Sequence, residues 1–244
     1  MSSVALDAQV LISEKAFEGR VDVWRKSDLR ILDAGGGTGD CTLTFAEQLQ
    51  RFNAGARVVH LDLSAKSQEV ARARAQHQGL LHLIQFVHGS LLDEELMASL
   101  GDFDFIQCTG VLHHLIRPAD GLSKLQGVLR PGGAMGLMVY GALGRTGVYD
   151  VQDIMRGVSS PIDDEADEVK HVKALLKALP ASSRVRKSGV WHAVEAVDQA
   201  GNDAEIYDLF LHSQDRPYTV DELYDWVERD VGMNIVGFNE ARPC

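Results

Sequence analysis

The feature that most constrains this chain is a cluster of glycines directly after a short apolar run. The run Ile31-Leu32 ends at Asp33, and residues 35–39 then include four glycines. The apolar run predicts a short buried strand, and the glycines predict a turn. Apolar residues resume at close to helical spacing, which predicts a helix, at Cys41, Leu43, Phe45 and Leu49. Strand, glycine turn and helix make half of a mononucleotide-binding unit, where glycine lets the backbone approach a ligand closely.

The spacing of the glycines restricts which class of ligand the turn can bind. The dinucleotide fingerprint G-x-G-x-x-G would need glycine at position 40, where Asp40 stands. Asp40 at a helix start would also repel a pyrophosphate. The pattern is D-x-G-x-G-x-G, from Asp33 through Gly35 and Gly37 to Gly39. It resembles motif I of class I S-adenosylmethionine-dependent methyltransferases, whose cofactor has no phosphate. A tight turn without a ligand remains the alternative for this motif alone.

A second predicted strand covers residues 57–62 and ends in Asp62. Its distance along the chain from Gly39 is close to that at which a strand-end carboxylate accepts hydrogen bonds from ribose hydroxyls. Ser64 can then cap a helix. The phrase His60-Leu61-Asp62-Leu63-Ser64 resembles the V-D-L-S stretch of methyltransferases. The resemblance implies that Asp62 holds the ribose and that Leu63 adjoins the cofactor; a simple turn residue is the alternative for Asp62.

The third and fourth predicted strands cover residues 83–89 and 102–108. Ser90 and Leu91 follow the third strand where relatives often carry an aspartate that meets adenine. Ser90 can offer only a hydroxyl there, and backbone contact beside Leu91 is expected. Cys108 and Gly110 end the fourth strand, and they complete the predicted cofactor contacts.

The stretch after the fourth strand carries two adjacent histidines. Its sequence Val111-Leu112-His113-His114-Leu115 resembles a stretch common in small-molecule methyltransferases, including those of ubiquinone and menaquinone pathways. His113 or His114 is a candidate general base. Packing and capping of the next turn is the equal alternative for each. We expect no metal here, because Gly110 offers no ligand.

A helix is predicted from Pro118 to Leu129, a turn over residues 130–133 and a fifth strand over residues 135–140. The succession L-x-x-V-L-R-P-G-G before an apolar strand is another family hallmark. Alternating strands and helices predict an α/β fold: a doubly wound, mostly parallel Rossmann-like sheet with helices on both faces. Ligands of such sheets bind beyond the carboxyl ends of the strands.

The predicted organisation has four parts. Residues 1–28 form an N-terminal helical segment, residues 29–140 the S-adenosylmethionine-binding core, and residues 141–217 a helical cap inserted after strand five. Residues 218–244 form the last helix, with Thr219 and Glu222 as reciprocal caps, and a sixth strand over residues 233–238. Too little chain follows for a seventh strand. Either the chain is a piece of a longer protein or its sheet edge ends differently.

Within the cap, acids at the start and lysines at the end predict a helix beginning near Asp163. Another helix is predicted from Val148, Val151, Ile154 and Met155, and a short one over residues 204–211. The polar and aromatic residues of the cap are its candidate substrate contacts. We select Tyr140, Arg145, Tyr149, His212 and Tyr218. Arg145 or Arg216 can hold a substrate carboxylate. Alternatively, Asp215 and Arg216 pin the cap to the sheet.

Composition limits the partners. The formal net charge of −11 and the pI of about 5.2 oppose binding to a phosphate backbone, so nucleic acid is an unlikely substrate. The basic stretch at residues 184–187 is interpreted as a solvated loop. No apolar run reaches the ~18 residues of a membrane span, and no signal peptide is evident. Three scattered cysteines suggest reduced thiols and a cytoplasmic location. The sequence does not indicate an oligomeric state.

The resemblance implies an enzyme that transfers a methyl group from S-adenosylmethionine to an oxygen, nitrogen or carbon atom of a small molecule. Positioning and exclusion of water supply most of such a rate, with a histidine base as an optional aid. A protein substrate, or a non-catalytic module that keeps the fold, are the alternatives. A nicotinamide-dependent reductase is disfavoured, because the chain has neither G-x-G-x-x-G at this turn nor Y-x-x-x-K.

Overall fold

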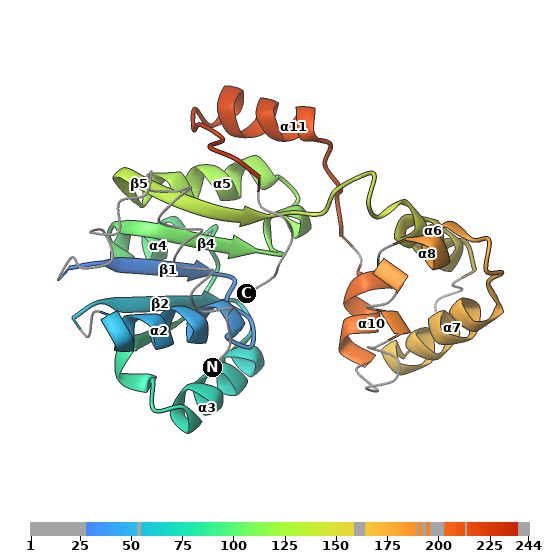
Figure 1. The fold of residues 1–244 in the computed structure, drawn as a ribbon, viewed down its shortest axis with the longest axis horizontal. Helices are drawn as coiled ribbons and strands as arrows, with labels where there is room; N and C mark the ends of the chain where they lie inside the picture. Colours follow the sequence, from blue (N-terminus) through green and yellow to red (C-terminus); the bar gives the residue numbers. More distant parts are fainter. Residues whose placement is uncertain are drawn as a thin grey trace. The chain divides into compact units, whose positions relative to one another are not determined.

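A computed structural model describes residues 28–52, 55–158, 164–188, 190–191, 194–195, 203–212 and 214–238. The chain divides into two compact units. The sheet unit consists of Met1–Val139 and Leu223–Cys244, and the helical unit consists of Tyr140–Glu222. Figure 1 shows the ribbon of both units, with most of their helices and strands labelled.

The sheet unit is built on five parallel strands in the order β3-β2-β1-β4-β5. Their bounds are β1 Arg30–Ala34, β2 Arg57–Asp62, β3 Ile84–His88, β4 Phe103–Thr109 and β5 Leu129–Met138. The central strands β1, β2 and β4 are almost wholly buried, as their apolar runs predict. The α/β fold with a parallel sheet is therefore confirmed. The order reverses between β1 and β4, which is where such sheets bind ligands.

Helices alternate with these strands along the chain. They are α2 Asp40–Phe52, α3 Ala65–His77, η3 Leu81–Leu83, α4 Glu94–Leu100, η4 Leu112–His114 and α5 Pro118–Gly127. Ser64 caps α3 by accepting a hydrogen bond from the Ser67 amide, as predicted. Asp93 caps α4 in the same way through the Leu96 amide.

Two predictions at the ends of the sheet are wrong. Residues 130–133 belong to β5 instead of a free turn, because the register with β4 shifts there: Phe103 pairs with Leu129, but Phe105 pairs with Ala134. The extra residues form a bulge. Residues 233–238 form no strand. They follow α11, Val220–Tyr224, and the π-helical η5, Asp225–Asp230.

The helical unit contains α6 Thr146–Val158, α7 Glu165–Ala178, α8 Arg184–Lys187 and α10 Asp203–Phe210. Its apolar core lies among these helices and includes Val148, Val151, Met155, Val172, Leu176, Val185, Ile206 and Phe210. Asp164 caps α7, whose first turn is acidic and whose last turn carries Lys177, as predicted. The basic stretch is the short helix α8 instead of a loop, because Val185 is buried in this core. Thr219 and Glu222 form the predicted reciprocal cap.

Three further predictions concern the state of the cysteines, membrane-spanning helices and the helices before residue 28. Cys108, one of the three cysteines, is a free and buried thiol. Across the described parts of the chain, no helix is long and apolar enough to cross a membrane. The helices predicted before residue 28 lie outside the described residues.

Candidate cofactor and acceptor sites

The glycine turn follows β1 at the reversal point of the sheet. Gly35, Gly37 and Gly39 all have positive φ angles, of 80°, 53° and 94°. This conformation explains why glycines alternate here, because residues with a side chain seldom adopt it. The amides of Gly35 and Gly36 both donate to the carbonyl of Leu61, at 2.7 and 3.1 Å. The turn is thereby anchored to β2.

Asp62 ends β2 and reaches across to the glycine turn. One carboxylate oxygen accepts a hydrogen bond from the Gly37 amide at 2.7 Å, and the other accepts one from the Ser64 amide at 2.7 Å. The carboxylate is therefore fixed by two backbone donors. Each oxygen keeps a further lone pair for a ligand donor such as a ribose hydroxyl.

The remaining predicted cofactor residues differ in exposure. Leu63 is 72% exposed, whereas Asp33, Leu91 and Cys108 are buried. Burial raises the pKa of the Cys108 thiol, which keeps it protonated. The Ser90 hydroxyl accepts a hydrogen bond from the Leu92 amide at 3.1 Å. Gly110 follows β4 with a φ of 74°. These residues all lie at or just beyond the carboxyl ends of strands, as the sequence predicts.

The two histidines differ sharply. His113 is wholly buried, whereas His114 is only partly buried, and their ring centroids lie 4.1 Å apart. A general base must reach an acceptor, so His114 is the better placed of the two, and the burial of His113 favours the packing role.

The candidate acceptor residues of the helical unit form one polar cluster. The Arg145 guanidinium stacks 3.4 Å from the centroid of the Tyr140 ring. The Tyr149 hydroxyl donates to one oxygen of Asp215 at 3.3 Å, and the Gln152 amide donates to its other oxygen at 3.3 Å. Burial, with the nearby Asp215 carboxylate as a second cause, raises the pKa of Tyr149 to about 12. The hydroxyl therefore stays a donor.

The other basic candidate is already paired. Arg216 contacts Glu222 at 3.1 Å and lies 4.7 Å from the centroid of the Tyr218 ring. Tyr218 is buried, and its amide donates to the carbonyl of Tyr140. Arg216 is therefore less suited than Arg145 to receive a ligand.

Gln152 is a member of the cluster that sequence reasoning missed. It is 1% exposed and also donates to the Leu209 carbonyl at 3.0 Å. A signal was present, since Gln152 lies on the apolar face that Val148, Val151 and Met155 define at helical spacing. A polar side chain on a buried face needs a partner.

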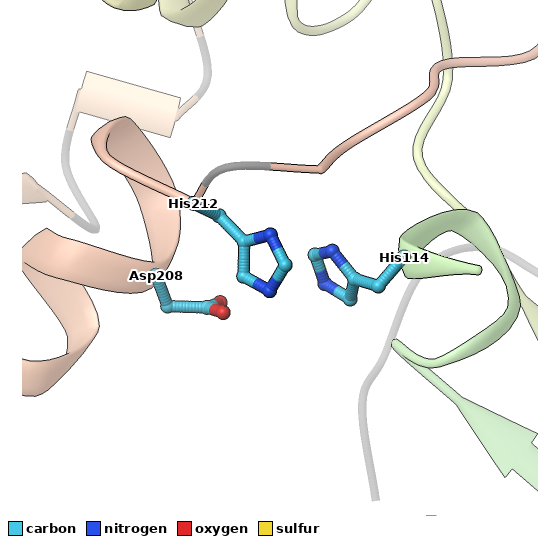
Figure 2. A group of neighbouring side chains, drawn as sticks. All are labelled: His114, Asp208 and His212. Atoms are coloured by element: carbon cyan, nitrogen blue, oxygen red, sulfur yellow. The ribbon is translucent and has the colours of Figure 1, made fainter. Parts of the chain in front are cut away.

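Asp208 was missed as well. It lies four residues before His212, and ligand atoms of the two side chains lie within 4.8 Å of one another. Figure 2 shows both at the end of α10; it also draws His114, the partly buried histidine of the sheet unit. Asp208 acts on Tyr140, whose pKa is raised mainly by burial and then by this carboxylate. Asp208 and His212 alone are fewer ligands than a zinc site requires.

The fold and the turn define a class I S-adenosylmethionine-dependent methyltransferase domain. Comparison with protein families agrees: residues 31–133 match the family described as methyltransferase domain. The S-adenosylmethionine-binding fold predicted from the sequence is confirmed.

Several known proteins resemble the chain. An uncharacterised protein of Synechococcus sp. is 33% identical over 216 residues, which is 86% of this chain and 48% of that protein. The tRNA 5-carboxymethoxyuridine methyltransferase of Escherichia coli K12 is 36% identical over 48% of this chain and 42% of its own length. A ubiquinone/menaquinone biosynthesis C-methyltransferase of Ruegeria sp. is 29% identical over 51% of this chain and 48% of its own. The chain thus spans about half the length of these relatives.

Among solved structures, PKMT2 from Rickettsia typhi in complex with AdoHcy superimposes with a TM-score of 0.58 at 18% identity. The match covers 84% of this chain and 39% of that one. At this identity the likeness concerns the fold alone.

Proposed function

We propose that this chain transfers the methyl group of S-adenosylmethionine to a small acceptor that carries an acidic group. The glycine turn and Asp62 bind the cofactor in the sheet unit. Tyr140, Arg145, Tyr149, His212 and Tyr218 of the helical unit bind the acceptor, and His114 serves as general base where the acceptor atom must lose a proton. A cytoplasmic location fits this proposal.

The observation that supports an acceptor with an acidic group is the lack of hydrogen-bond partners for two nitrogen atoms of Arg145. Its Nε and Nη2 atoms are buried and have no hydrogen-bond partner among the residues that the structure describes. These two nitrogens form the side edge of the guanidinium, whose parallel N–H bonds match the two oxygens of a carboxylate. A buried donor edge without an acceptor is costly, so a ligand carboxylate would stabilise it.

The charge of the chain supports a small acceptor over a nucleic acid. A net charge of −11 repels a polyanion, but one buried guanidinium still binds one carboxylate. The relative that acts on tRNA matches only 116 residues of this chain. Its acceptor is therefore a weak guide to the acceptor here.

Calorimetric titration with S-adenosylmethionine and S-adenosylhomocysteine tests the cofactor half of the proposal. Micromolar binding supports it. Absence of binding to the folded protein contradicts it and leaves a non-catalytic role. Binding without turnover on any acceptor also favours the non-catalytic module.

A screen of paired acceptors tests the other half, using carboxylic acids and their amides, with release of S-adenosylhomocysteine as the readout. We expect turnover of acids and not of the matching amides. Arg145→Gln should raise the KM of the acid at least about tenfold, as for loss of a charge-assisted pair, and Arg145→Lys should not restore it. Arg184→Gln is the matched control, since Arg184 is an exposed arginine of the same unit. Equal turnover of acid and amide contradicts the acidic acceptor.

A further inference from the structure

Three polar side chains lie buried directly beneath the glycine turn. Asp33 of β1, Thr42 of α2 and His60 of β2 are at most 2% exposed. Asp33 and His60 are paired in register on neighbouring strands. The Thr42 hydroxyl lies 2.5 Å from Asp33 Oδ2 and 2.8 Å from His60 Nδ1. The hydroxyl therefore bridges a carboxylate and an imidazole.

This trio forms the floor of the turn. A Cβ atom built on Gly36 would lie 2.4 Å from His60 Nδ1 and 3.0 Å from Asp33 Oδ2. The turn thus rests on the imidazole and the carboxylate without space between them. Strand β2, which carries His60, also carries Asp62 two residues later, and Asp62 accepts a hydrogen bond from the Gly37 amide. A change in any of these three side chains therefore affects the conformation of the turn.

Counting protons fixes the directions of the two hydrogen bonds. Thr42 has one hydroxyl proton, so it can donate to only one of its two neighbours. When Asp33 is ionised, Thr42 donates to the carboxylate. His60 must then carry its proton on Nδ1 and donate to the Thr42 oxygen. Its Nε2 atom, which is buried without a partner among the described residues, is then a bare lone pair.

Uptake of one proton by Asp33 reverses both bonds. The protonated carboxyl donates to the Thr42 oxygen, and Thr42 donates to His60 Nδ1. The imidazole then carries its proton on Nε2. The net charge of the trio changes from −1 to zero, while every polar atom between the carboxyl and Nδ1 keeps a partner. A single proton thus switches both the charge and the histidine tautomer.

The surroundings decide where that proton goes. Burial raises the pKa of Asp33 to about 6, and the neighbouring Asp62 and Asp40 carboxylates add to this rise, against the Thr42 hydrogen bonds. Burial lowers the pKa of His60; Asp62 opposes this change and Arg72 adds to it. Cys108, which also faces Asp33, stays a neutral thiol. The proton therefore binds Asp33, and the imidazole stays neutral.

We propose that Asp33, Thr42 and His60 form one proton-sharing chain beneath the turn, and that its negative charge favours S-adenosylmethionine over S-adenosylhomocysteine. The inference rests on the proposed function, because it assumes that the cofactor binds over this turn. The two nucleotides differ by the methyl group and by the positive charge on sulfur. An ionised Asp33 attracts the positive sulfonium of S-adenosylmethionine and has no such effect on the neutral thioether of S-adenosylhomocysteine. The charge of the trio therefore helps S-adenosylhomocysteine to dissociate after methyl transfer.

The test is the ratio of the two dissociation constants, Kd of S-adenosylhomocysteine over Kd of S-adenosylmethionine, measured by calorimetry at pH 7.5 and pH 5.5. The ratio cancels groups that act equally on both ligands. We expect it to be about threefold higher at pH 7.5, because one charge at an effective dielectric constant of about 20 has a larger effect than this, but a carboxyl with a pKa of about 6 is only partly titrated between the two pH values. Asp33→Asn should lose this dependence, and Thr42→Val should change it, whereas Thr44→Val, on the more exposed side of α2, should behave as wild type.

A second measurement needs no ligand. Nitrogen-15 spectra of the histidine rings should find the His60 proton on Nδ1 at pH 7.5 and on Nε2 at pH 5.5. A ratio that does not change with pH in the wild type, or a His60 proton on Nε2 at pH 7.5, overturns the inference. Absence of binding by either nucleotide at both pH values contradicts the proposed function instead, and the tautomer measurement still decides the state of the trio.

Discussion

The sheet unit and the helical unit prepare their sites by different means. In the sheet unit, backbone groups do most of the work: glycines with positive φ shape the turn, and two amides fix Asp62. In the helical unit, side chains contact side chains, as Tyr149 and Gln152 do around Asp215. A backbone site depends on a few glycines in fixed spacing, whereas a side-chain site can change with each substitution. This difference explains why the cofactor is easier to infer than the acceptor.

The largest expected effect concerns His114, where the backbone-built sheet unit would contribute a reacting side chain. His114→Gln should lower kcat about 100-fold or more with little change in KM, if the acceptor loses a proton in the transfer. The matched variant His113→Gln should instead lower the thermal midpoint, because His113 is wholly buried. Steady-state rates and thermal unfolding of both variants separate the roles. A rate within threefold of wild type for His114→Gln would mean that positioning alone suffices.

Asp62 tests the backbone-anchored side of the comparison. Asp62→Asn turns one of its two acceptor oxygens into a donor, which then faces a backbone amide. We expect the Kd of S-adenosylmethionine to rise about 100-fold, as for loss of two charge-assisted hydrogen bonds. Calorimetry measures it. Asp164→Asn, at the cap of α7, is the control; asparagine caps a helix about as well as aspartate, so the affinity should stay unchanged. An unchanged affinity for Asp62→Asn would exclude Asp62 from cofactor binding.

The same difference decides how much the sequence could predict. The glycine spacing, the strand ending in Asp62 and the cap at Ser64 are local patterns, and each is found in the structure. The bulge at residues 130–133 was missed because it depends on the register of β5 against β4, and a single strand carries no record of register. The error at residues 233–238 is the reverse, because a strand was predicted there from a β-prone run, and in the structure these residues pair with no strand of the described sheet.

The polar contacts of the helical unit lie beyond local patterns. Asp215 meets Tyr149 and Gln152 only because the end of the unit folds back onto α6. Likewise, nothing near Thr42 in the sequence indicates that its hydroxyl joins Asp33 to His60, which lies on another strand. Residue type and spacing therefore identified the cofactor turn, but not the groups beneath it or the partners of the acceptor residues.

A pair of glycines tests whether the helical unit also has a position that backbone geometry controls. A Cβ atom on Gly147 would lie 2.3 Å from the backbone nitrogen of Val185, whereas one on Gly157, in the same helix, meets nothing within 4 Å. Gly147→Ala should destabilise the protein by about 2–3 kcal/mol, because backbone cannot move aside as a side chain can. Gly157→Ala should stabilise it by about 0.5–1 kcal/mol through helix propensity. Denaturant unfolding measures both. Equal effects of the two variants would contradict the close packing of α6 on α8.

The last prediction concerns the buried charge of Asp33, where a side chain lies under the backbone-built turn. Its pKa is raised from 3.8 to about 6, so the folded protein holds this proton more tightly than the unfolded chain does. The stability that this group contributes is full below about pH 4 and is lost as the pH rises to about 6. Asp33→Asn carries no such loss. It should therefore be about 3 kcal/mol more stable than wild type at pH 7.5, with the difference shrinking towards zero near pH 4.

Denaturant unfolding of wild type and Asp33→Asn across this pH range measures the difference. The lowered pKa of His60 has the opposite effect on stability, since the unfolded chain then takes up the proton, but it is common to both proteins and cancels. Asp40→Asn is the control: Asp40 is an exposed carboxylate near the same turn, and its removal should cost less than about 1 kcal/mol. If Asp33→Asn is instead the less stable protein at pH 7.5, the ionised carboxylate is held without cost by Thr42. Burial of the ionised Asp33 would then cost no folding free energy, so binding of the positive sulfonium would have no such cost to offset.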